Sequence, residues 1–110
     1  YDFGLDDGAL FQVLRQAKED GIVIPAHCEN DGVVNYLRGW YKAQGLTQPI
    51  YHARSRPARC EAEAVSRLLR IAEAVDIPVV IVHLTNAAAL REVAAARKRG
   101  QKLYAETCPQ

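Results

Sequence analysis

Two short apolar runs, each closed by a histidine and followed by a helical pattern, constrain the fold of this 110-residue chain most strongly. The runs cover residues 22–26 and 77–82, and the second is almost entirely β-branched. Continuous apolar strands of this kind are typical of parallel sheets, whose two faces are both covered. Strands that alternate with helices along the chain run parallel, so His27 and His83 are expected to leave the same carboxyl edge of one sheet.

Helix signals around the two runs complete a repeated β/α winding. Asp6 and Asp7 open a first helix, which Gly21 ends. Asn30 or Asp31 can cap the second. The remaining expected elements are a loop over 46–57, helices over 58–75 and 87–99, and a final strand over 102–105. Three parallel strands alone would leave two open edges. The pattern therefore predicts an α/β fold in which residues 1–110 form one segment of a (β/α)8 barrel.

Composition narrows the partners and the setting. A formal net charge of +1 gives no reason to expect nucleic acid or an anionic membrane as a partner. No apolar run approaches the roughly 20 residues that would cross a bilayer. Three scattered cysteines fit no disulfide framework and favour a reducing cytoplasm. The absence of any methionine leads us to expect a piece of a longer chain.

Two imidazoles that converge at the carboxyl edge of a sheet suggest a shared metal ion. Neutral imidazoles suit zinc, and their placement after two neighbouring strands favours this interpretation over incidental histidines. A structural zinc site that adds Cys28 and Cys108 to His27 and His83 is a weaker alternative, because the spacing lacks a Cys-x-x-Cys element.

Other polar residues near these strand ends allow two interpretations each. Glu29 either orients a metal-bound imidazole or forms a helix cap or salt bridge. Glu106 either reaches the mouth of the barrel or packs against the next helix. For His52, the neighbouring Arg54 and Arg56 favour a structural hydrogen-bonding cluster over a direct catalytic role.

Four segments, taken together, resemble the hydantoinase/dihydropyrimidinase branch of the amidohydrolase superfamily. They are Ala-His-Cys-Glu-Asn at 26–30, Tyr-His-Ala-Arg-Ser-Arg-Pro at 51–57, Val-His-Leu-Thr at 82–85 and Glu-Thr-Cys-Pro-Gln at 106–110. Their order and intervals suit that family, and the likeness covers nearly the whole chain. It corresponds to only a middle portion of such an enzyme.

The resemblance implies a metal-dependent hydrolase of cyclic amides, built on a TIM barrel, that opens hydantoin or dihydropyrimidine rings to N-carbamoyl amino acids. In that family two divalent metals, usually zinc, lie at the barrel mouth. His27 and His83 match the two single histidines that hold one of them, and Tyr1 matches a tyrosine whose hydroxyl supports the oxyanion. The His-x-His pair, the aspartate and the bridging carboxylated lysine of the family have no match here. The resemblance also implies a homo-oligomer, commonly a tetramer.

Three other interpretations stay open. Dihydroorotases and allantoinases share the ligand scheme, so the chain can belong to a cyclic amidohydrolase of that type. Non-enzymatic dihydropyrimidinase-like proteins keep the fold but lose metal ligands, and the retention of both His27 and His83 argues against this alternative. A free-standing small α/β domain with incidental histidines is the third. The chain alone, with at most half of the metal ligands, is expected to be inactive.

Overall fold

The computed structural model describes residues 4–109, which form three parallel strands and five helices in one elongated body of 47 × 26 × 21 Å. In chain order the elements are α1 (Asp7–Asp20), β1 (Ile24–Ala26), α2 (Asp31–Ala43), α3 (Ile50–Arg54), α4 (Ala58–Val75), β2 (Val79–Ile81), α5 (Ala87–Lys98) and β3 (Leu103–Ala105). The strand order is β1-β2-β3, and both pairs are parallel. This arrangement confirms the predicted α/β winding.

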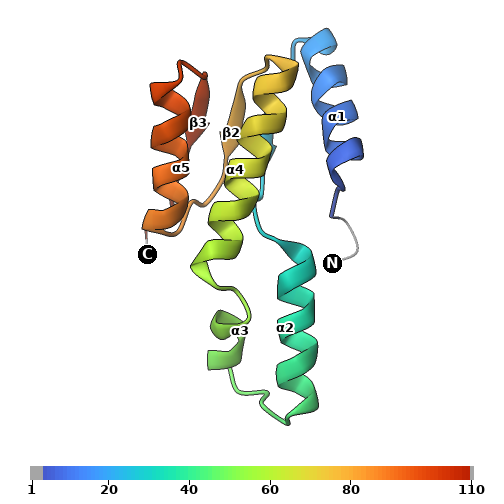
Figure 1. The fold of residues 1–110 in the computed structure, drawn as a ribbon, viewed down its shortest axis with the longest axis vertical. Helices are drawn as coiled ribbons and strands as arrows, with labels where there is room; N and C mark the ends of the chain where they lie inside the picture. Colours follow the sequence, from blue (N-terminus) through green and yellow to red (C-terminus); the bar gives the residue numbers. More distant parts are fainter. Residues whose placement is uncertain (1–3, 110) are drawn as a thin grey trace.

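Helices α1, α4 and α5 pack together along one face of the sheet (Figure 1). The core between them and the strands is apolar, and its largest fully buried side chains include Leu14, Leu69 and Ile81. Because side chains alternate along a strand, the middle residues of the three strands, Pro25, Val80 and Tyr104, point away from this helical layer. None of the elements in residues 4–109 covers that second face of the sheet.

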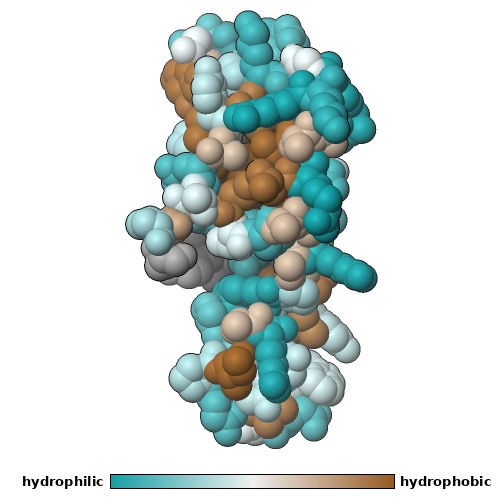
Figure 2. All heavy atoms as spheres, turned by 90° about the vertical axis from the view of Figure 1, so that its left-hand side faces the viewer, coloured by the Kyte–Doolittle hydropathy of each residue, from teal (hydrophilic) through white to brown (hydrophobic). Residues whose placement is uncertain are grey.

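Helices α2 and α3 lie beyond the carboxyl end of the strands and lengthen the molecule in that direction (Figure 1). On the face that Figure 2 shows, hydrophobic residues gather mainly at the level of the sheet, and the end formed by α2 and α3 is mostly hydrophilic. Within residues 4–109, no helix combines the length and the apolar character that crossing a membrane requires.

Local signals explain where the helices begin and end. The Asp6 carboxylate accepts the N–H of Ala9 at 2.8 Å and so caps α1, while Gly21 takes the left-handed conformation (φ 69°) that ends it. Asn30 caps α2, and Asn86 caps α5. The predicted helix over 58–75 has the bounds of α4.

The strands are shorter than predicted, and the segment 46–57 is not wholly a loop. Each strand has three residues, because only those lie in register with a neighbour. Residues 50–54 form the short helix α3, which Pro49 precedes with a helical backbone. Successive residues of a strand direct their backbone groups to opposite sides. The carbonyl of Ala26 faces β2, so the backbone nitrogen of Pro25 faces the open edge of the sheet, where a missing N–H is tolerated.

Candidate metal centre

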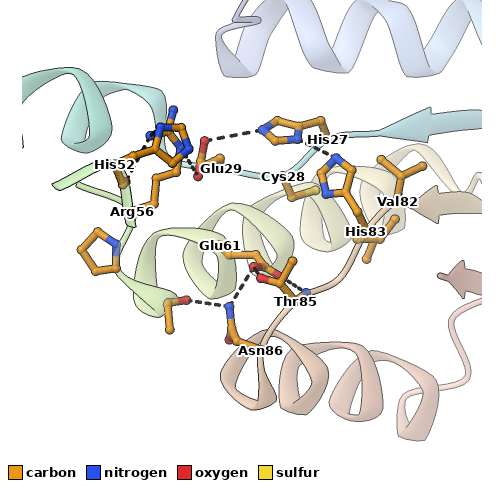
Figure 3. Close-up of a pocket in the computed structure, with 13 residues that line it drawn as sticks. His27, Cys28, Glu29, His52, Arg56, Glu61, Val82, His83, Thr85 and Asn86 are labelled. Carbon is orange, nitrogen blue, oxygen red and sulfur yellow. Dashed lines mark hydrogen bonds and ion pairs between the residues drawn. The ribbon is translucent and has the colours of Figure 1, made fainter. Parts of the chain in front are cut away.

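His27 and His83 meet at the carboxyl edge of the sheet, as the sequence predicted. Nδ1 of His27 and Nε2 of His83 are 2.9 Å apart, and the ring centroids are 4.7 Å apart at an interplanar angle of 59°. The rings come from the ends of β1 and β2, and Figure 3 shows that they turn toward each other. Two ring nitrogens that are 56 positions apart in the chain therefore face each other at hydrogen-bonding distance.

The backbone of His83 departs from a regular strand. Ile81 points into the helical layer, and strict alternation would send the side chain of His83 the same way. Instead His83 has φ 39°, a left-handed conformation that is uncommon for residues other than glycine. Hydrogen bonds fix the chain on both sides, because Val82 donates to the carbonyl of Ala26 at 3.2 Å and Leu84 donates to that of Glu106 at 2.7 Å. The neighbouring strands therefore hold the turn that brings His83 to the sheet edge.

Glu61, near the start of α4, anchors the segment that follows His83. Its carboxylate accepts the backbone N–H of Thr85 at 2.7 Å, the Thr85 hydroxyl, and the Asn86 side-chain amide at 2.8 Å. Asn86 in turn caps α5 by accepting the N–H of Ala89 at 2.9 Å. The sequence analysis did not single out Glu61, because nothing in its local sequence indicates a contact across 24 positions.

Glu29 lies beside both an imidazole and an arginine, which correspond to two of the roles that the sequence left open for it. One carboxylate oxygen lies 3.6 Å from Nε2 of His27, and the other lies 3.3 Å from Nε of Arg56. Asn30 behaves as the expected helix cap by accepting the N–H of Val33 at 3.0 Å, and it also donates to Glu63 at 2.7 Å. The backbone of Glu106 accepts the hydrogen bond from Leu84, and its side chain is exposed.

The remaining sequence candidates are placed as follows. His52 is exposed and its ring lies 3.3 Å from Arg56, in agreement with a hydrogen-bonding cluster. Cys28 is buried, and burial, followed by the charge of Glu61, raises the pKa of its thiol to about 12. Cys108 is exposed. Tyr1 lies outside the described residues.

Residues 4–109 contain no set of three or more His, Cys, Asp or Glu side chains arranged to hold a metal ion. The described donors for a shared cation are thus the two imidazoles alone. Both line a hollow of about 460 Å³, which Figure 3 shows in close-up between the strand ends and the residues around the start of α4. Glu29, Arg56 and Glu61 contribute to its walls.

Known proteins match this chain along nearly its whole length, although no family model matches. A D-hydantoinase from Ralstonia pickettii is 46% identical over 104 residues, which is 94% of this chain and 23% of that protein. A D-phenylhydantoinase from Escherichia coli is 42% identical over 111 residues, which is 100% of this chain and 24% of that protein. No match to a family model was found for any part of the sequence.

Solved structures give the same result for the fold. The dihydropyrimidinase from Brevibacillus agri NCHU1002 superposes with a TM-score of 0.95 at 42% identity, over 100% of this chain and 24% of that one. The chain thus spans about a quarter of the length of the relatives it matches. Its three parallel strands with their helices are a partial (β/α)8 barrel, and the chain is homologous, along nearly all of its length, to the hydantoinase/dihydropyrimidinase family of cyclic amidohydrolases.

Proposed function

We propose that His27 and His83 are ligands of one divalent metal ion in the active site of a cyclic amidohydrolase. The substrates are hydantoins or dihydropyrimidines, and hydrolysis of the ring amide yields an N-carbamoyl amino acid. The observation that carries the proposal is the 2.9 Å separation of Nδ1 of His27 from Nε2 of His83 at the carboxyl edge of the sheet. The homology to D-hydantoinases supports the choice of substrate class.

The donor set fits a metal such as zinc. Tetrahedral zinc with Zn–N bonds of about 2.0–2.1 Å places two ligating nitrogens roughly 3.3 Å apart. The two imidazole nitrogens are a few tenths of an ångström closer than that. The two histidines follow adjacent strands with a fixed register, so a small rotation of the side chains is enough to widen this distance to the value that zinc requires.

The reaction adds water across an amide bond that is a poor electrophile. A bound divalent metal supplies a water of lowered pKa, near 7, and polarises the carbonyl. His27 and His83 hold the ion as neutral ligands, which leaves its positive charge available to the carbonyl oxygen. The hollow that they line, about 460 Å³, offers space beside them for a small ring.

The finer expectations from the resemblance belong to the same proposal. They are zinc as the metal, two ions in each complete site, Tyr1 as support for the oxyanion, a homotetramer of the full-length protein, and the cytoplasm as its location. The other metal ligands of the family have no match in this chain. A polypeptide of these residues alone is therefore expected to show no turnover of hydantoin or dihydrouracil, even with added zinc.

Metal content and activity of the full-length protein test the assignment. We expect His27→Ala and His83→Ala each to lower the bound metal per chain and to abolish ring opening of hydantoin and dihydrouracil. Tyr36→Ala serves as a control, because it removes an exposed ring from α2, away from the hollow. Full metal occupancy in both histidine variants would overturn the ligand assignment. Turnover of dihydroorotate or allantoin in place of hydantoin would overturn the substrate class.

A further inference from the structure

The two nitrogens of the His27 ring face different groups. Nδ1 faces His83 at 2.9 Å, while Nε2 lies 3.6 Å from a carboxylate oxygen of Glu29, slightly beyond hydrogen-bond length. Figure 3 shows Glu29 on the side of the His27 ring away from His83. The nitrogen that is not directed at the proposed metal position therefore faces a negative group.

Glu29 is held in this position by Arg56. Its second oxygen lies 3.3 Å from Nε of the guanidinium, so each carboxylate oxygen has its own partner. The side chains of Glu29 and Arg56 are only 23% and 28% exposed. Partial burial reduces the screening of this ion pair by water, which favours a single position of the carboxylate.

The short helix α3 in turn fixes Arg56. Its Nη1 donates to the carbonyl of His52 and to the hydroxyl of Ser55, both at 3.3 Å. Ser55 is fully buried and itself donates to the same His52 carbonyl at 2.8 Å. The guanidinium is therefore tied to a buried turn and does not extend freely into solvent.

We propose that Arg56 and Glu29 are positioning residues for His27. This inference rests on the proposed role of His27 as a metal ligand. A small turn of either side chain brings Nε2–H within hydrogen-bond length of the carboxylate, which then holds the ring proton on Nε2 and leaves the lone pair of Nδ1 directed toward the site shared with His83. Histidines that bind metals usually donate their other N–H to such a carboxylate, and loss of that partner typically weakens metal binding 10–100-fold. Segment 50–56, through Arg56, thereby acts on the metal site without contacting the metal.

Zinc affinity of the full-length protein tests the inference. The probe is Zn²⁺ alone, measured by competition with a chromophoric chelator, and the variants are Glu29→Gln, Arg56→Gln, the double variant and His27→Ala. We expect Glu29→Gln to weaken zinc binding at least tenfold and Arg56→Gln to weaken it measurably. Because Arg56 acts through Glu29, the double variant should bind zinc as Glu29→Gln does.

Glu63→Gln is the matched control. Like Glu29, Glu63 pairs with an arginine, Arg67. It accepts a hydrogen bond from Asn30 and has no contact with either imidazole. Its substitution should leave zinc affinity unchanged. Far-UV circular dichroism checks that every variant is folded, and Glu29→Asp, which restores the charge, should recover part of the affinity.

The outcomes separate this inference from the proposed function. If His27→Ala binds zinc like the unmodified protein, the ligand assignment fails and the positioning role fails with it. If His27→Ala loses zinc while Glu29→Gln does not, only the positioning role is overturned. If the effects of Glu29→Gln and Arg56→Gln add in the double variant, Arg56 acts through the fold and the relay from Arg56 to His27 is overturned.

Discussion

Removal of the Glu61 carboxylate should loosen the segment that follows His83. In Glu61→Ala, the N–H and hydroxyl of Thr85 and the side-chain amide of Asn86 lose their acceptor. Hydrogen bonds to charged groups are worth about 1.5–3 kcal/mol, and ordinary ones about 0.5–1.5 kcal/mol. Glu61 is half-buried and water competes for its oxygens, so we take about 0.7 kcal/mol for each of the three bonds, which gives about 2 kcal/mol in all.

Hydrogen exchange of the full-length protein measures this loss where it occurs. A local loss of about 2 kcal/mol corresponds to roughly 30-fold faster exchange of the Thr85 amide. Amides in the middle of α4 should keep their protection, because the substitution lies in the first turn of that helix. Glu61→Gln keeps one acceptor oxygen and should give an intermediate rate.

The control for this experiment is Glu19→Ala, which removes an exposed carboxylate whose partner is Arg15 in the same helix. Exchange at Thr85 should be unchanged in that variant. If Thr85 exchanges at the same rate in Glu61→Ala as in the unmodified protein, the contacts of Glu61 do not stabilise this segment, and the anchoring role assigned to Glu61 is wrong.

Two further predictions concern packing. Leu69 is 1% exposed at the centre of the core, so Leu69→Ala should lower the free energy of unfolding by about 2–5 kcal/mol in denaturant titrations. Leu90→Ala, at a side chain that is 54% exposed, should lower it far less. Equal losses in the two variants would contradict the burial assigned to Leu69 in α4. Among the three cysteines, the exposed Cys108 should react with a thiol reagent at pH 8 in the native protein, while Cys28 and Cys60 should react only after unfolding. Burial raises the pKa of both of these thiols, that of Cys28 to about 12, so at pH 8 Cys28 is almost entirely protonated and Cys60 has less thiolate than a free cysteine. Rapid labelling of either in the native state would contradict this.

The helices could be predicted closely because their signals are local. The bounds of α4 follow from Pro57 before it and from an apolar stripe that runs to Val75. Asn30 was one of two candidate caps for α2, and its carboxamide oxygen accepts the first-turn N–H that a cap requires. The meeting of His27 and His83 was also predictable, because strand–helix alternation fixes which sheet edge each one leaves.

The features that were missed depend on contacts between distant segments. The turn of His83 into the left-handed region is held by hydrogen bonds to Ala26 of β1 and to Glu106, just after β3, and no local sequence pattern at His83 indicates it. Helix α3 is short and follows a proline in a segment without apolar periodicity, so its pattern was typical of a loop. The contacts of Glu61 with Thr85 and Asn86 cross from one helix to the segment before another, which a charge pattern alone does not predict.

The two histidines are held at the sheet edge by different contacts, and each set of contacts includes a residue at or just before the start of α4. His27 follows its strand with ordinary backbone geometry, and a side-chain partner, Glu29, faces its ring. His83 is directed by its backbone instead, through a left-handed conformation and an anchored segment beyond it. Arg56, just before α4, supports the first arrangement, and Glu61, in its first turn, supports the second. A displacement of this helix end would therefore disturb the supports of both imidazoles at once, whereas the strands that precede them would keep their register.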